Sequence, residues 1–297
     1  MQRKIKLSIS IKCFLILFFG ISLISSDNFF AKDRKENHFN DLNKKVFNSI
    51  IKKAKKQNWH NLHIQDIIIN VAMNFIDFPY KSGTLDIPGP EKCRVDFSGL
   101  DCVTFMENSL CLARIIKKQK YNYNDLIDEI TYTRYRNGKL TDYSSRLHYT
   151  SEWIFDNEKK SVIENITKLA GGVEHLFNTN FMSSNPKYYE ALKNDESIVK
   201  KIKLIENEIT KMPNYIIPLN LIEENYKYFK SGDIVAIATS INGLDYSHVG
   251  LIFIDDQKNV RFFHASSKHK KVMVDTTLAD YVKSVKSNIG ITVLGPL

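Results

Sequence analysis

The stretch Asp101-Cys102-Val103-Thr104-Phe105-Met106 opens an amphipathic run that continues to about residue 118. Apolar side chains recur in this run at the spacing of one helix face, namely at Val103, Phe105, Met106, Leu110, Ala113 and Ile116. We therefore expect a helix packed on a core, with Cys102 in its first turn and Asp101 or Ser98 as its N-cap. Because a helix N-terminus favours an anion, a cysteine in this place is a candidate nucleophile.

The last 65 residues have a different pattern. Short β-branched or aromatic runs at 233–238, 247–254, 260–264 and 272–274 are separated by turn-like segments, which predicts an antiparallel meander. His248 lies at the start of the second run and His264 at the end of the third, so a hairpin that turns near residues 255–259 brings them within a few residues of each other. Cys102, His248 and His264 together predict a thiol nucleophile, its base and an orienting group, the last of which fixes the tautomer of the base.

The rest of the chain is expected to be mostly helical up to the meander. Residues 41–56 and 64–76 have helical spacing, whereas glycines and prolines make 81–100 a loop. Residues 125–134 fit a short helix or strand, 135–160 show no clean periodicity, and 186–211 are helical and charged.

The first 26 residues have the features of an export signal. Four basic residues precede the apolar stretch 13–24, and Ser25-Ser26-Asp27 follows it. This stretch of about 12 residues is short for a membrane span, which needs about 20. We expect residues 1–26 to be a signal peptide cleaved after Ser26 or Ala31, with an uncleaved anchor as the alternative. The mature protein then has no stable membrane span, acts in the periplasm or cell envelope, and starts with a disordered lead-in at residues 27–40.

Composition and charge agree with an exported globular protein. Hydrophobic residues make up 43% of the 297 residues, which is enough for a packed core. The net charge of +9 includes four basic residues of the signal, so the mature chain keeps a mild positive bias. Such a bias suits an anionic surface such as a cell wall. Nucleic acid is not expected as a partner, because the chain has an export signal and lacks a basic stripe.

Cysteine counting favours a free thiol. Once the signal is removed, Cys93, Cys102 and Cys111 remain, and an odd number in an exported chain leaves at least one unpaired. Cys102 and Cys111 are separated by about 13.5 Å of helix rise, but a disulfide needs Cα atoms within about 7 Å. A Cys93–Cys111 pair is left open, and Cys111 is most simply a small buried residue. No HExxH, CxxC, GxSxG or glycine-rich phosphate loop is present, so neither a metal nor another cofactor is expected.

Four motifs together resemble one family of exported bacterial proteins. They are Leu100-Asp101-Cys102-Val103-Thr104-Phe105-Met106-Glu107, Arg146-Leu147-His148-Tyr149 with Trp153, Gly243-Leu244-Asp245-Tyr246-Ser247-His248-Val249-Gly250, and His264-Ala265-Ser266. The family is described as N-acetylmuramoyl-L-alanine amidase-like, within the NlpC-type, papain-like cysteine peptidase superfamily. The resemblance extends over roughly residues 45–297. It implies an α+β papain-like fold in a single domain, 41–297, with a helical N-terminal part, an insertion at about 120–230, and the nucleophile helix packed on a C-terminal antiparallel sheet.

The resemblance also implies roles for individual residues. Cys102 is the expected nucleophile, His248 the base and His264 the orienting residue, while Tyr80 and Asp101 are expected to support the oxyanion site. The implied reaction is cleavage of an amide bond in peptidoglycan or muropeptides, between muramic acid and L-alanine or inside the stem peptide. Acyl transfer at the same site and a non-catalytic peptidoglycan-binding protein are the alternatives.

The stretch 134–157 is dense in groups that bind carboxylates and sugars. Arginine forks recognise carboxylates with two hydrogen bonds, and peptidoglycan stem peptides contain several carboxylates. We predict substrate contacts by Arg136, Arg146, His148, Tyr149 and Trp153. The alternative is a solvated surface with Trp153 in the core. If the prediction is right, Arg146→Ala raises KM for a peptide substrate.

Overall fold

The computed structural model describes residues 27–297, and side chains from residue 41 onward. The predicted signal peptide, 1–26, lies outside the described residues. The chain divides into two compact units, residues 1–38 and 39–297, and the account below concerns the second. Among the described residues, no helix combines the length and apolar character needed to cross a bilayer.

Helices dominate the first half of the described chain. They are α1 (Asp27–Lys56), α2 (Ile64–Ala72), α3 (Cys102–Lys117), α4 (Tyr123–Arg134), α5 (Thr150–Lys159), α6 (Phe181–Ser184), α7 (Glu196–Ile209) and α8 (Leu278–Lys283). Residues 27–40, for which we expected a disordered lead-in, form the first part of α1. No glycine or proline interrupts 27–56, so a helix nucleated in the packed part can extend toward the N-terminus. The helix expected over 186–211 is shorter, since it begins only after the Asp195 cap.

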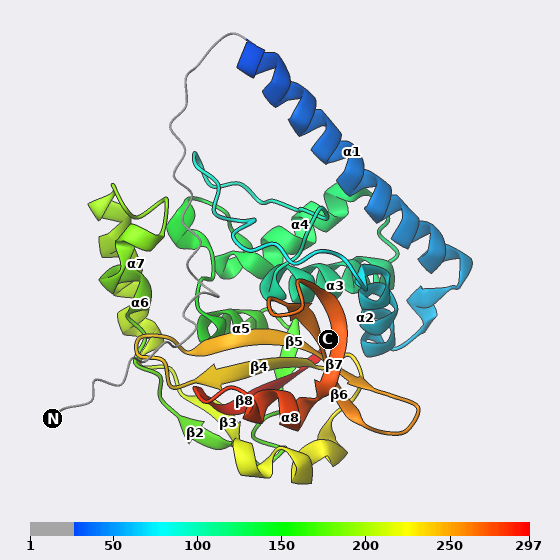
Figure 1. Cartoon of the computed structure of the whole chain (residues 1–297), viewed down its shortest axis with the longest axis vertical. Coiled ribbons are helices and arrows are strands. Elements are labelled where there is room, and N and C mark those ends of the chain that lie inside the picture. Colours follow the sequence, from blue (N-terminus) through cyan, green and yellow to red (C-terminus); the bar gives the residue numbers. More distant parts are fainter. Residues whose placement is uncertain (1–26) are drawn as a thin grey trace, which may run out of the picture. The chain divides into compact units, whose positions relative to one another are not determined.

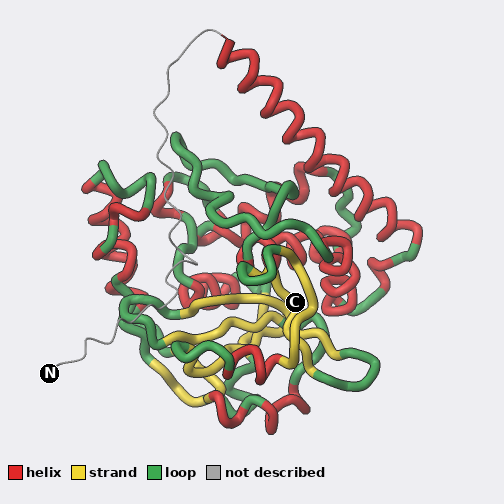
Figure 2. Tube along the Cα trace, viewed as in Figure 1, coloured by secondary structure: helices red, strands yellow, loops and turns green. Residues whose placement is uncertain are grey.

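The strands form one antiparallel sheet in the order β2-β3-β8-β4-β5-β6-β7, with β1 paired to β8 (Figures 1 and 2). They are β1 (Ile163–Asn165), β2 (Val173–His175), β3 (Asn214–Pro218), β4 (Ile234–Thr239), β5 (Tyr246–Ile254), β6 (Val260–Ser266), β7 (Lys271–Thr277) and β8 (Asn288–Pro296). The predicted meander is confirmed as β4 to β7. The sequence pattern did not predict β8, which lies inside the sheet between β3 and β4.

Each face of the sheet packs against a different set of elements. On one face, Ala236, Val249 and Phe263 share a core with α2 and α3. On the other face, Ile237, Ile252 and Phe262 share a core with α8 and the short 3-10 turns at 219–228. Burial of apolar side chains on both faces stabilises the sheet and fixes its register, because a slip of one residue would exchange the faces. The register therefore decides which side each site residue occupies.

The loop between residues 81 and 100 returns to its starting point. Tyr80 forms an isolated parallel bridge with Leu100, and the Leu100 N–H donates to the Pro79 carbonyl at 2.9 Å. Although some twenty residues separate them in sequence, Tyr80 and Leu100 are neighbours in space. Tyr80 is thereby brought within two residues of the start of α3.

Candidate active site

Asp101 sets the start of the cysteine helix. Its carboxylate accepts a hydrogen bond from the Thr104 N–H at 2.8 Å, and the Thr104 hydroxyl accepts one from the Asp101 N–H at 2.9 Å. This capping box satisfies two backbone donors and places Cys102 as the first residue of α3. Of the two predicted caps, the structure selects Asp101. Ser98 instead donates to the Asp96 carboxylate.

The Cys102 sulfur faces the start of β5. Paired residues of β5 and β6 begin at Leu251↔Phe263, so Val249 lies before that ladder starts. Burial and, to a lesser extent, the Asp101 charge raise the pKa of the Cys102 thiol to about 12, although the N–H groups of Val249, Val103 and Cys102 oppose the rise. The expected lowering by the helix N-terminus is present in these N–H groups, but burial outweighs it. The resting thiol is therefore protonated at neutral pH.

His248 and His264 form a direct pair between β5 and β6. Nε2 of His248 lies 2.7 Å from Nδ1 of His264, and the two rings meet edge to face. Both histidines lie on the α8-side face of the sheet. His248 lies opposite Ile237 of the α8-side core, and His264 is two residues after Phe262 of the same core, so its side chain is on the same face. Burial and the neighbouring His264 hold the pKa of His248 well below 6.5, so both imidazoles are neutral at neutral pH. The predicted contact between the histidines is confirmed.

The thiol and the imidazoles approach the start of β5 from different sides. Cys102 packs at the edge of the α2–α3 core, whereas the ring of His248 lies near the rings of Phe262 and Tyr281 on the α8 side. The sulfur faces the N–H of Val249, the residue that directly follows His248. The structure thus places Cys102 beside Val249 of β5 and pairs His248 with His264.

One acidic residue of this site escaped the sequence analysis. Asp275 on β7 places Oδ2 at 3.2 Å from Nε2 of His264. The predicted run 272–274 ended one residue too early to include it. A signal was nevertheless present, since Asp275 directly follows the apolar run 272–274, which comes next after the run that holds His264.

Tyr80, the predicted oxyanion-supporting residue, pairs with Leu100, which lies two residues before the start of α3. Its backbone N–H donates to the Lys270 carbonyl at 2.8 Å, and this bond ties it to the turn between β6 and β7. The length of the 81–100 loop is therefore no obstacle to a role for Tyr80. That role stays a prediction.

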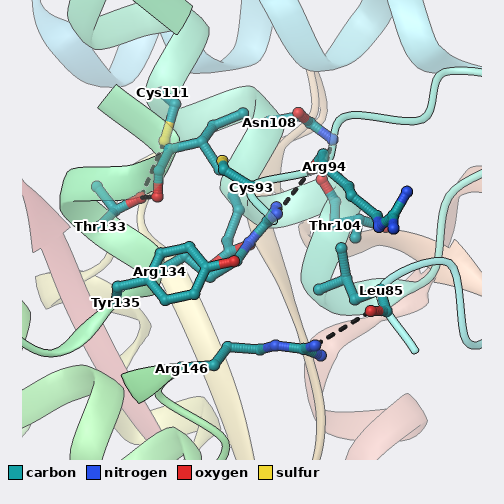
Figure 3. A network of polar contacts seen from close by, with 12 residues as sticks. Leu85, Cys93, Arg94, Thr104, Asn108, Cys111, Thr133, Arg134, Tyr135 and Arg146 are labelled. Atoms are coloured by element: carbon teal, nitrogen blue, oxygen red, sulfur yellow. Dashed lines mark hydrogen bonds and ion pairs between the residues drawn. The ribbon is translucent and has the colours of Figure 1, made fainter. Parts of the chain in front are cut away.

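The arginine-rich stretch uses its polar atoms inside the protein (Figure 3). The Arg146 guanidinium donates to Glu91 through Nε and Nη2, to Asp86 through Nη1, and to the Leu85 carbonyl through Nη2, at distances of 2.8 to 3.1 Å. Arg134 is 2% exposed and pairs with Glu107 at 2.8 Å. Both arginines hold the 81–100 loop, because Arg134 also donates to the Arg94 carbonyl.

The other predicted substrate-binding residues are similarly engaged. Arg136 donates to Glu152 at 2.6 Å, and Tyr149 donates to Glu206 at 2.7 Å. His148 contacts the Tyr143 carbonyl at 2.8 Å, and burial lowers its pKa to about 3. Trp153 is 4% exposed and belongs to the main core. Substrate contact by these residues stays a prediction, and their visible contacts are structural.

Arg146 also lines a cavity of about 360 Å³ between the 85–91 loop, residues 141–146 and the segment before α7. Most charged groups in its wall are carboxylates, namely Asp86, Glu91, Asp142, Glu190 and Asp195. Cys102, His248 and His264, all of them described residues, are not part of this wall. The cavity is therefore separate from the cysteine–histidine site.

The three described cysteines are all free. Cys111 is fully buried and lies 3.2 Å from the Thr133 hydroxyl, which agrees with its interpretation as a small core residue. Cys93 lies near the Ile127 carbonyl, and burial raises the pKa of its thiol. Of the three, only Cys102 lies at a helix start, and it lies beside Val249, the residue that follows His248.

Comparison with known proteins gives a consistent family. A model of the N-acetylmuramoyl-L-alanine amidase-like family matches residues 70–291. Two crystal structures of an N-acetylmuramoyl-L-alanine amidase from Bacteroides uniformis are each 30% identical with a TM-score of 0.75; one covers 79% of this chain and 99% of its own, the other 78% and 98%. A Bacteroides fragilis structure described as that of a candidate xylanase is 33% identical, with a TM-score of 0.72 over 75% of this chain and 98% of its own. No curated protein was found to match.

Proposed function

Because this chain belongs to the N-acetylmuramoyl-L-alanine amidase-like family, we propose that it hydrolyses an amide bond of peptidoglycan with Cys102 as nucleophile and His248 as base. In this proposal the fold is of the NlpC-type, papain-like class. The signal peptide directs the protein to the periplasm or cell envelope, where the substrate lies. The bond between N-acetylmuramic acid and L-alanine is the first candidate, since the related Bacteroides uniformis structures are named for its cleavage.

The observation that supports this proposal best is the histidine pair next to Val249. Nε2 of His248 is engaged by His264 at 2.7 Å, so Nδ1 is the ring nitrogen left to act on substrate and thiol. The Val249 N–H, one residue away, faces the Cys102 sulfur. A thiol and two imidazoles are groups of acyl transfer, whereas glycoside hydrolysis canonically uses two carboxylates. The site therefore favours an amidase over a xylanase.

The pKa directions favour proton transfer during attack. A preformed thiolate–imidazolium pair would need both groups to be charged at rest. Burial instead keeps the thiol protonated and the imidazole neutral, because both charged forms lose solvation at the site. His248 then accepts the thiol proton as the sulfur reaches the amide carbon, and a substrate that excludes water strengthens this exchange.

The reaction proceeds in two balanced halves. The sulfur adds to the amide carbon while Nδ1 of His248 takes the thiol proton. His248 gives this proton to the amide nitrogen, the C–N bond breaks, and an amine leaves a thioester on Cys102. Water then loses a proton to His248 and attacks the thioester. The C–S bond breaks, the proton returns to sulfur, and a carboxylic acid is released.

Backbone amides at the start of α3 are the proposed oxyanion donors. The Thr104 N–H is used by the Asp101 carboxylate and the Phe105 N–H by the Asp101 carbonyl. The N–H groups of Cys102 and Val103 remain on the side of the sulfur. A developing oxyanion placed there gains both amides and the positive end of the helix dipole, and the hydroxyl of Tyr80 is the proposed third donor.

Digestion of purified peptidoglycan tests the proposal. We expect wild-type protein to release stem peptides with a free L-alanine N-terminus, identified by mass spectrometry, and Cys102→Ala to release none. Products cut inside the stem peptide would change the bond but keep the mechanism, whereas products from both proteins would refute it. Binding of peptidoglycan without products from either protein would favour the non-catalytic alternative. A parallel digestion of xylan, expected to yield nothing, tests the xylanase alternative directly.

A further inference from the structure

We propose that Asp275 is a positioning residue that sets the proton positions on both histidines of the site. Its effect on rate rests on the proposed amidase function. The proton positions themselves exist without any reaction and are measurable independently of it.

The local strand geometry aims Asp275 at His264. In the β6–β7 ladder, Phe263 lies opposite Val274, but Arg261 lies opposite Thr277, so β7 has an extra residue between them. A bulge of this kind bends the strand and redirects a side chain, and bulges are frequent beside active sites. Here Oδ2 of Asp275 reaches Nε2 of the fully buried His264 at 3.2 Å. Oδ1 is held by the Thr276 N–H at 2.7 Å.

Hydrogen bonds link Asp275, His264 and His248 in one series, which we call the hydrogen-bond chain. The Asp275 carboxylate at its end dictates the direction of both bonds. Ionised Asp275 can only accept, so the His264 proton must lie on Nε2. Nδ1 of neutral His264 is then an acceptor and requires the proton of His248 on Nε2. Nδ1 of neutral His248 consequently has a free lone pair, which is the form that a general base needs. One carboxylate thus prepares the base through two imidazoles.

Asp275 is ionised at neutral pH, as the groups around it and around His264 indicate. The titratable groups that face His264 are His248 from β5, Asp275 from β7, His269 from the β6–β7 turn and Tyr281 from α8. Although burial alone would raise it, the Thr276 N–H and His264 hold the pKa of Asp275 below its usual value. Burial lowers the pKa of His264 to about 4, and Asp275 limits this fall. At neutral pH the chain is therefore one carboxylate and two neutral rings.

Nitrogen-15 NMR of histidine-labelled protein reads the ring protons directly. We expect both His248 and His264 in the Nε2–H form at pH 7. In Asp275→Asn the amide can donate to Nε2 of His264, which reverses the chain and puts the protons on Nδ1. Asp275→Glu restores an acceptor and is expected to restore the Nε2–H forms. Wild-type His264 in the Nδ1–H form would overturn the proposal, whether or not the protein is an amidase.

Kinetics on peptidoglycan fragments give the second readout. We expect Asp275→Asn to lower kcat/KM about 10- to 100-fold, as loss of an outer-shell partner typically does, with partial rescue in Asp275→Glu. The acidic limb of the pH profile should also move to lower pH, because the carboxylate no longer stabilises an imidazolium. Asp256→Asn on the exposed β5–β6 turn removes the same charge and is expected to act like wild type. If Asp275→Asn and Asp256→Asn had the same kcat/KM and the same acidic limb of the pH profile, the positioning role would be contradicted. A wild type without hydrolysis but with the expected tautomers would refute only the amidase proposal.

Discussion

The histidine pair on β5 and β6 and the arginine-rich stretch 134–157 are both dense in polar groups, but they use them differently. In the pair, hydrogen bonds run from His248 through His264 to Asp275. Nδ1 of His248 takes no part in this series of hydrogen bonds. In the arginine-rich stretch, by contrast, Arg146 uses all three of its nitrogens on internal acceptors.

This difference separates chemistry from structure. The histidine pair can act on a substrate, whereas the Arg146 network, a closed network in which all three guanidinium nitrogens have internal acceptors, holds the 81–100 loop. Residue types alone do not distinguish the two cases. The residues of the closed network should therefore affect stability, and those of the histidine pair should affect rate.

The largest expected contrast is between two histidines. His248→Ala should lower kcat/KM about 10⁴-fold, equal to roughly 5.5 kcal/mol of transition-state stabilisation, because the base and its relay are lost. His148→Ala should leave kcat within about twofold but lower stability, because it frees the buried Tyr143 carbonyl. Paired kinetics and urea unfolding check both. A large rate loss in His148→Ala would erase the distinction between the regions.

Arg146→Met sharpens the same contrast. Removal of the guanidinium leaves the largely buried Glu91 carboxylate without its cation, so we expect a loss of about 3 to 5 kcal/mol in the free energy of unfolding. Adding Glu91→Gln should recover part of this loss, because no buried charge then remains. Denaturant unfolding measures both variants. A raised KM at unchanged stability would instead restore Arg146 as a substrate-binding residue.

Lowering the pH should reduce stability through His148 in the arginine-rich stretch and activity through His248 in the histidine pair. Burial lowers the pKa of His148 to about 3, below the unfolded value near 6.5, so its contribution to stability is complete above pH 6.5 and is lost as pH falls toward 3. The slope is at most about 1.4 kcal/mol per pH unit. His148→Gln should flatten this slope in unfolding measurements between pH 6.5 and 4.5. The acidic limb of wild-type kcat/KM should lie below pH 6.5, because the pKa of His248 is lowered.

Much of the fold and half of the site could be predicted from the sequence because they depend on local patterns. The helical period placed α3 and its cap, and the β-branched runs placed β4 to β7. β8 was missed because residues 288–296 include two glycines and no polar alternation, as expected of a strand with neighbours on both edges and cores on both faces. The engagement of Arg146 was also beyond reach, because its partners Asp86 and Glu91 lie some sixty residues away in a loop without periodicity.

The smallest predicted effect tests how Asp101 serves the site. Asp101→Ala should lower the free energy of unfolding by about 1 kcal/mol, because the Thr104 N–H loses its acceptor. Asp101→Asn keeps an acceptor and should stay near wild type, and Ser98→Ala is the matched control at the other predicted cap. Both Asp101 variants remove a charge that raises the pKa of Cys102, so alkylation of Cys102 by iodoacetamide at pH 8 should be faster in each. Unchanged alkylation would mean that burial alone keeps the thiol protonated and that Asp101 belongs to the structural region rather than to the reactive one.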